Sequence, residues 1–289
     1  MINQDSLLEL MDMPDPYFPI KVHRCSAKEY GAVIFPNHWH KHIEILLFMS
    51  GKALVECNSI PNTVEAGELV IVNSNDLHAG ISLAENLSYY ALIFDPSLLQ
   101  SQSLDAIETK FIAPIIQNSI LFDNKIAINS GLEGCFLSIV KELDDHAIGY
   151  ELSIKSHLFQ MLTILTRHHV AQMLPVNDQK TRLKNLERFA PILHYIETHY
   201  QEELSVEMLA QKVGLSRFHF SRLFKNLTGK AITEYINGIR VNRAEYLLRN
   251  TTMTVSEVAL STGFHDIYYF SRIFKKITKV PPSRIQKSD

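Results

Sequence analysis

The feature of this sequence that most limits its fold is a repeated stretch of ten residues. FSRLFKNLTG occupies residues 220–229, and the closely similar FSRIFKKITK occupies residues 270–279. A repeat of this kind indicates that a structural unit is duplicated. Each copy lies in a longer segment, 205–229 or 254–279, whose pattern of short helix, glycine-containing turn and second helix is typical of a helix-turn-helix.

The ends and turns of both units carry suitable residues. Ser205 and Thr254 come directly before the first helices, where a side-chain oxygen can cap the helix N-terminus. Gly214 and Gly263 follow those helices, and glycine relieves backbone strain in a tight turn. The sequence therefore predicts two helix-turn-helix units.

The second helix of each unit has an apolar face and an opposite polar face. The apolar positions follow the spacing i, i+3, i+4, i+7 and are expected to be buried: Phe220, Leu223, Phe224 and Leu227, and Phe270, Ile273, Phe274 and Ile277. The opposite positions are Phe218, Ser221, Arg222 and Lys225, and Tyr268, Ser271, Arg272 and Lys275. Arginine and serine can bind base edges and lysine can neutralise phosphate, so this division predicts two DNA-recognition helices rather than two solvated helix faces.

Charge is divided unevenly along the chain. Residues 181–289 contain 17 Lys and Arg and 10 Asp and Glu, a net charge of +7, whereas residues 1–180 contain the remaining 11 and 21, a net charge of −10. A basic C-terminal third indicates a module that binds a polyanion such as double-stranded DNA. Residues 231–250, between the units, predict one long helix that would hold the recognition helices about one DNA turn, roughly 34 Å, apart.

The first part of the chain has a different pattern. Short apolar runs separated by turn residues predict an antiparallel barrel or sandwich between Lys21 and about Asp95. The strands are expected at 43–49, 52–57, 67–72 and 89–94.

Two helices are expected after these strands, at about 131–146 and 151–169. They either pack on the barrel or form a dimer interface. The polar, proline-containing segment 173–182 predicts a linker between a domain at 1–172 and a domain at 183–289.

Cysteine usage and hydropathy restrict where the protein acts. Cys25, Cys57 and Cys135 are scattered and predict neither a disulfide framework nor a metal site. The sequence lacks an apolar run long enough to cross a membrane, and its N-terminus lacks the pattern of a secretion signal. We therefore expect a cytoplasmic protein with no membrane partner.

Residues 187–287 resemble the DNA-binding domain of the AraC/XylS family of bacterial transcription regulators. The resemblance is carried by the second unit and its tail, VSEVALSTGFHDIYYFSRIFKKITKVPPSRIQK, and above all by Gly263-Phe264, Tyr269-Phe270, Arg272, Phe274-Lys275 and Pro281-Pro282. The sequence departs from the family at Lys279, where glycine is usual, and at Ile285-Gln286, where Tyr-Arg is common.

This resemblance implies which residues contact bases. They are Phe218, Ser221 and Arg222 in the first unit, and Ile267, Tyr268, Ser271 and Arg272 in the second. Arg217, Lys225 and Lys275 complete the candidate DNA-binding set. Ile267 cannot hydrogen-bond a base edge, but it can contact a thymine methyl group.

A second conspicuous stretch, FPNHWHKHIEILLFMSG at 35–51, places three histidines and a glutamate within seven residues. Because alternate residues of a strand share a face, His38, His40, His42 and Glu44 would point the same way in a regular strand. His78 follows a later strand. Three imidazoles and a carboxylate are a set that can bind a divalent metal ion.

The spacing of these residues resembles the cupin motifs, although Asn73 and Asn75 replace the usual Pro and Gly of the second motif. AraC-type regulators commonly carry a cupin-like N-terminal domain, and the resemblance implies a pocket for a small-molecule effector, often a sugar, usually without metal. We therefore assign effector binding to His38, His40, His42, Glu44 and His78, and expect no cofactor. A metal site at His38, His40, Glu44 and His78, and histidines with purely structural roles, are the alternatives.

The sequence thus predicts an α+β protein: a cupin-like β-barrel with flanking helices, followed by an all-α domain with two helix-turn-helix units. The expected function is a ligand-responsive transcription regulator and not an enzyme. A cupin metalloenzyme, such as an isomerase or dioxygenase, fused to a DNA-binding domain is the alternative. The expected partners are double-stranded DNA, a small-molecule effector, a second copy of the chain and RNA polymerase.

Overall fold

The computed structural model describes residues 7–103, 105–127 and 129–285. The chain forms two compact units whose main division falls between Leu183 and Lys184. The segment 173–182, expected to be a linker, contains the end of a short strand, β11 (Val170–Met173), and the first turns of a helix, α4 (Val176–His199).

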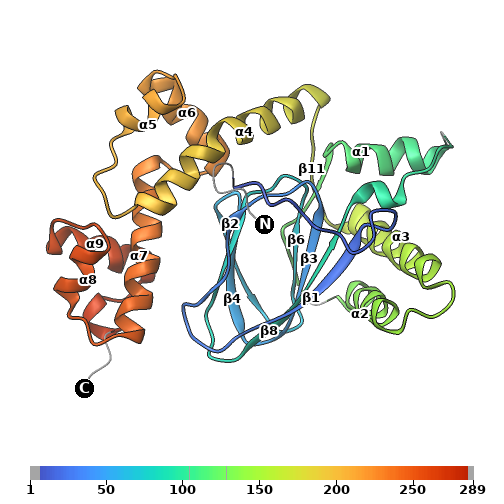
Figure 1. The fold of residues 1–289 in the computed structure, drawn as a ribbon, viewed down its shortest axis with the longest axis horizontal. Helices are drawn as coiled ribbons and strands as arrows, with labels where there is room; N and C mark the ends of the chain where they lie inside the picture. Colours follow the sequence, from blue (N-terminus) through green and yellow to red (C-terminus); the bar gives the residue numbers. More distant parts are fainter. Residues whose placement is uncertain (1–6, 104, 128, 286–289) are drawn as a thin grey trace. The chain divides into compact units, whose positions relative to one another are not determined.

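The first unit is built on antiparallel strands (Figure 1). Their bounds are β1 Ile20–Ala27, β2 Val33–His38, β3 Ile43–Ser50, β4 Lys52–Cys57, β5 Ile60–Glu65, β6 Leu69–Val72, β7 His78–Ser82, β8 Leu87–Phe94, β9 Ile120–Phe122 and β10 Lys125–Ile126. One sheet has the order β1-β8-β3-β6-β10 and the other β2-β7-β4-β5, while β9 pairs with β11. The predicted strands correspond to β3, β4, β6 and β8.

Strand β3 is buried on both faces, which explains its unbroken apolar sequence. Ile45 and Leu47 face a cluster formed with the helices, whereas Leu46 and Phe48 face the interior between the two sheets. Alternation along the strand places Glu44 on the interior face with Leu46.

The helices that follow the strands cover the outer face of the five-stranded sheet (Figure 1). Helices α2 (Ser130–Asp145) and α3 (Tyr150–His168) pack against each other and contribute Phe136, Ile139 and Leu158 to that cluster. They are preceded by a turn of 3-10 helix (Pro96–Leu99), a turn of π-helix (Glu108–Ile112) and α1 (Ala113–Ile116). Packing on the barrel is therefore one role of these helices.

The second unit is helical. Its helices after α4 are α5 Val206–Lys212, α6 Arg217–Thr228, α7 Ile232–Asn250, α8 Val255–Ser261 and α9 Ile267–Thr278, and a 3-10 turn follows at Pro282–Arg284. Both helix-turn-helix units are present, as α5–α6 and α8–α9. The predicted fold, a cupin-like sheet domain followed by a helical domain, is confirmed.

Candidate functional site

Side-chain caps fix the ends of the helices in both units. Ser205 accepts a hydrogen bond from the Met208 amide, and Thr254 forms a reciprocal capping box with Glu257. The glycines of the two turns adopt a left-handed backbone, with φ of 64° at Gly214 and 86° at Gly263. The predicted caps and turns are therefore present.

Aromatic residues anchor the second helix of each unit. Phe220 and Phe224 of α6 pack around Phe189 of α4, and Phe270 packs on Phe264 and Phe274. These positions are buried, as predicted. Leu223, Leu227 and Ile273 are half-buried.

One prediction about the apolar faces is wrong. Ile277, expected in the core, is 40% exposed. It lies in the last turn of α9, directly before the helix ends at Thr278, where fewer neighbours cover the face.

The opposite faces of α6 and α9 are available to a partner. Phe218 is 79% exposed and Tyr268 is 90% exposed, although both are large aromatic residues. Arg222, Lys225, Arg272 and Lys275 are also exposed, as is Ile267, while Ser221 and Ser271 are half-buried. Exposed aromatic side chains among basic ones are typical of a binding surface rather than of a solvated face.

Two of the arginines contact their own domain. The Arg217 guanidinium lies 2.7 Å from the Glu207 carboxylate of α5, in an exposed ion pair. Arg272 lies over the ring of Tyr269, 5.4 Å from its centroid. These contacts orient both side chains at the start and middle of the recognition helices.

Helix α7 connects the two units as one continuous helix. At about 1.5 Å per residue its 19 residues span roughly 28 Å. Near its start, Tyr235 packs edge-on against Phe224 of the first unit. Further along, Val241, Ala244 and Leu248 belong to the core of the second unit. Because α7 packs on both units along its length, the two recognition helices are held by a rigid spacer.

Lys279 occupies a position that favours glycine. It ends α9 with φ of 68°, as Gly229 ends α6 with φ of 71°. A left-handed residue with a side chain costs about 1 kcal/mol or more. The departure from the AraC/XylS pattern at Lys279 therefore preserves the helix end, at some cost in stability.

In the first unit, four of the five predicted effector residues come together. His38, His40, Glu44 and His78 are buried, and one ligand atom from each lies within 4.8 Å of the others. His38, His40 and Glu44 were expected on one strand but do not share one. His38 ends β2, His40 lies in the connection, Glu44 belongs to β3, and His78 begins β7.

His42 is separate from this cluster. Its ring lies beside that of His40, with 5.9 Å between centroids, but it contributes no atom to the group of four. Burial lowers the pKa of His42. The break between β2 and β3 ends the alternation that would have aligned it with His38, His40 and Glu44.

The Nδ1 atoms of the clustered histidines all face backbone carbonyl oxygens. The distances are 2.7 Å from His38 to Pro36, 3.1 Å from His40 to His42, and 2.8 Å from His78 to Asp76. A carbonyl oxygen only accepts hydrogen bonds, so each Nδ1 carries the proton. In a neutral ring this leaves a lone pair on Nε2.

The Nε2 atoms face carboxylates. Glu44 Oε2 lies 3.3 Å from His40 Nε2 and 3.1 Å from His78 Nε2. Burial alone would raise the pKa of Glu44, but the contacts with His40 and His78 outweigh burial and hold the pKa below its usual range. The cluster therefore keeps its carboxylate ionised.

Glu9 is a member of this site that the sequence did not reveal. Its Oε2 lies 2.9 Å from His38 Nε2, and its side chain remains 27% exposed. The contact with His38 lowers the pKa of Glu9. The Glu9 amide also donates to the Trp39 carbonyl, which fixes this segment beside the histidines. No local pattern links a residue before β1 to His38, so alternation could not have found it.

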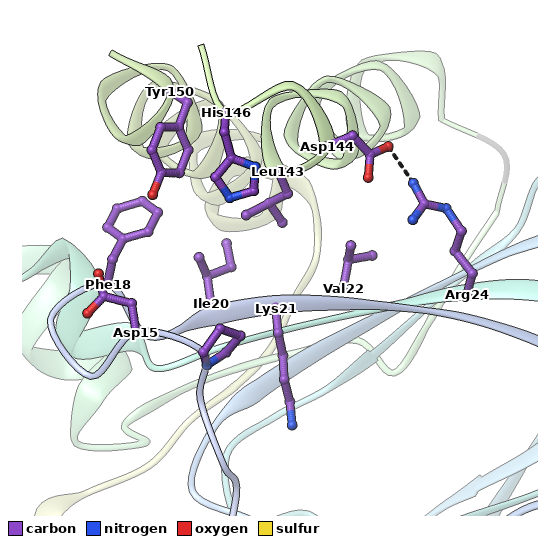
Figure 2. A pocket seen from close by; sticks show the side chains of 11 residues that line it. Asp15, Phe18, Ile20, Lys21, Val22, Arg24, Leu143, Asp144, His146 and Tyr150 are labelled. Atoms are coloured by element: carbon purple, nitrogen blue, oxygen red, sulfur yellow. Dashed lines mark hydrogen bonds and ion pairs between the residues drawn. The ribbon is translucent and has the colours of Figure 1, made fainter. Parts of the chain in front are cut away.

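A separate cavity of about 420 Å³ lies between the start of β1 and the α2–α3 connection (Figure 2). Ile20 and Val22 rise from β1 into it, and Phe18 and Tyr150 pack edge-on at one end. At the other end Arg24 forms an ion pair with Asp144. This cavity is a second place where a small molecule could bind the first unit.

Comparison with known protein families identifies the two domains that carry these sites. Residues 22–162 match a family described as the AraC-like ligand binding domain, and residues 209–288 match a helix-turn-helix domain family. The chain belongs to the AraC family of transcription regulators.

Individual relatives align along almost the whole chain. An uncharacterized HTH-type transcriptional regulator of Bacillus subtilis, YdeC, is 23% identical over 98% of this chain and 96% of its own length. The HTH-type transcriptional activator RhaS of an Enterobacter species is 26% identical over 88% of both chains. Among solved structures, fatty-acid-bound ToxT of Vibrio cholerae covers 92% of this chain and 94% of its own, with 16% identity and a TM-score of 0.40.

The AraC-family assignment settles the choice between regulator and enzyme. The relatives that align with both units are regulators, so the chain is a transcription regulator with a ligand-binding domain and not a fused cupin metalloenzyme. Among the residues that the structure describes, none of the helices has the length and apolarity to cross a bilayer.

Proposed function

We propose that this AraC-family regulator reads two neighbouring major-groove segments of one duplex with α6 and α9. The observation that carries the proposal is the matched exposed face of the two helices, with Arg222 and Arg272 at equivalent positions opposite buried phenylalanines. Arginine can form a bidentate contact with guanine, and the rigid α7 spacer would keep the two contacts about one helical turn apart.

The other exposed residues divide by chemistry. Ser221 and Ser271 would bind base edges, and Phe218, Ile267 and Tyr268 would make apolar or stacking contacts. Arg217, Lys225 and Lys275 would bind phosphate and supply the salt-dependent part of the affinity.

Selection of bound duplexes from a random pool by the full-length protein tests this reading. We expect enriched sequences with two constant blocks whose centres lie about 10 base pairs apart. A protein that binds every duplex alike, with no enriched block, would contradict the proposal, because phosphate contacts alone carry no sequence information.

We further propose that an effector controls this binding from the barrel, at His38, His40, Glu44 and His78. The supporting observation is a buried polar cluster inside a domain matched to a ligand-binding family. A sugar remains our proposed class of organic effector.

The cavity beside Arg24 and Asp144 is the second candidate effector site, and its volume favours it. If the effector no longer changes DNA binding in His78→Ala but still does so in Asp144→Ala, the histidine cluster in the barrel is the effector site.

The protein is proposed to act as a homodimer in the cytoplasm. Helix α3 buries one face on the barrel, but Leu152 is 76% exposed and Phe159, seven residues later, is also exposed. Residues seven apart lie on the same side of a helix, so these two form an apolar stripe suited to a second copy. Since RhaS is named a transcriptional activator, we also propose that the DNA-bound dimer contacts RNA polymerase.

Sedimentation of the full-length protein tests the dimer. We expect a dimer at micromolar concentrations and a monomer for the Leu152→Glu/Phe159→Glu double variant, since two charges would be buried in the interface. Ile60→Glu on β5, also at an exposed apolar residue, is the matched control and should stay dimeric. A wild-type protein that sediments as a monomer at tens of micromolar would rule the dimer out.

A further inference from the structure

The three clustered histidines direct their Nε2 atoms at the same carboxylates. With Nδ1 of each ring directed at a carbonyl oxygen, the Nε2 atoms lie 2.9 to 3.3 Å from the oxygens of Glu44 and Glu9. Among the described side chains, His78 Nε2 is buried and makes no hydrogen bond, although Glu44 Oε2 is 3.1 Å away.

The three rings also lie close together. The ring centroids are 4.1 Å apart for His38 and His78, 4.9 Å for His40 and His78, and 5.7 Å for His38 and His40. With the Glu44 carboxylate among them, they place four potential ligand atoms around one centre.

A divalent cation fits this arrangement. Its charge of +2 would offset the two carboxylates, and the three Nε2 atoms, including that of His78, would gain a common partner. Metal–ligand bonds of about 2.0–2.2 Å place neighbouring ligand atoms roughly 3 to 4 Å apart. The four ligand atoms lie within 4.8 Å of one another, so only small side-chain shifts are needed.

The surroundings also fit a metal site. Each histidine is oriented by a second hydrogen bond from Nδ1, the arrangement that fixes the tautomer of metal-binding histidines. Imidazole nitrogens favour first-row transition ions over Mg²⁺ or Ca²⁺. Glu9 leaves an entry side, because its side chain is part-exposed while those of His40 and His78 are fully buried.

We propose that this AraC-family barrel binds one divalent first-row transition-metal ion through Nε2 of His38, His40 and His78 and the carboxylate of Glu44. The sequence favoured a metal-free pocket because the second cupin motif is incomplete. Asn73 and Asn75 are nevertheless outside the group of four, so the changed motif leaves the ligands in place. The inference rests on the proposed function only in treating this cluster as the sensing site.

The test uses the untagged full-length protein, stripped with a chelator and titrated with Zn²⁺, Mn²⁺, Co²⁺ or Ni²⁺. We expect one ion per chain by elemental analysis, a raised thermal midpoint, and nitrogen ligation in the absorption spectrum of the Co²⁺ form. Glu44→Gln keeps the side-chain volume and should weaken binding at least tenfold, and His40→Ala/His78→Ala should abolish it.

His42→Ala is the matched control, because His42 lies on the same stretch but outside the cluster, and it should bind the ion as the wild type does. Absence of uptake by the wild type, or equal uptake by the Glu44→Gln and double variants, would overturn the metal site. Measuring duplex binding by the same samples distinguishes failure of the metal site from failure of the proposed DNA-binding function. A chain that binds DNA but no metal loses only this inference, and one that binds metal but no DNA loses the proposed function.

Discussion

Arg222→Ala and Arg272→Ala are each expected to weaken binding to a selected duplex by about 1–3 kcal/mol, or roughly 5- to 150-fold. Each substitution removes one bidentate donor pair from a base edge. Both side chains lie opposite the buried phenylalanines of their helices, so folding should be little changed. If the helices contact DNA independently, the double variant should lose about the sum of the two free energies.

Fluorescence anisotropy with the selected duplex and with a scrambled one measures this loss. Arg243→Ala is the matched control, since it removes the same charge from an exposed position of α7. We expect it to reduce affinity for both duplexes slightly and equally, because it changes only the overall charge. Wild-type affinity in both Arg222→Ala and Arg272→Ala would mean that α6 and α9 are not the recognition helices.

The recognition helices could be predicted because the residue spacing that identifies them lies within a single helix. The i, i+4 spacing of Phe220 and Phe224, repeated at Phe270 and Phe274, defines a buried face whatever surrounds it. The prediction was wrong at Ile277, near a helix end, where burial depends on neighbours that spacing does not describe.

The barrel site depends on tertiary contacts and could be predicted only in part. Strand alternation grouped His38, His40 and Glu44 correctly, although they span two strands and their connection. The same rule also included His42, which lies outside the group of four, because alternation does not indicate where a strand ends. Glu9 reaches His38 from a segment far away in the chain, so only the folded structure reveals it.

Gly263→Ala is expected to destabilise the helical unit by about 2–5 kcal/mol. The backbone at Gly263 has φ of 86°, which costs a residue with a side chain about 1–2 kcal/mol. A Cβ atom there would also lie 2.7 Å from the Gln201 carbonyl oxygen and 2.8 Å from its Cα atom. Those are backbone atoms that cannot rotate away, so overpacking adds about 1–3 kcal/mol.

Gly214→Ala in the first unit separates the two contributions. Its φ of 64° carries the same backbone cost, but a Cβ atom there would meet nothing within 4 Å. Denaturant unfolding followed by far-ultraviolet circular dichroism should therefore show a smaller loss, of about 1–2 kcal/mol. Trp39, the one tryptophan, is buried in the barrel domain and reports on that unit separately. Its fluorescence transition should stay unchanged in both variants. Equal losses at Gly214 and Gly263 would mean that the turn backbone alone, and not the close approach to Gln201, requires glycine at Gly263.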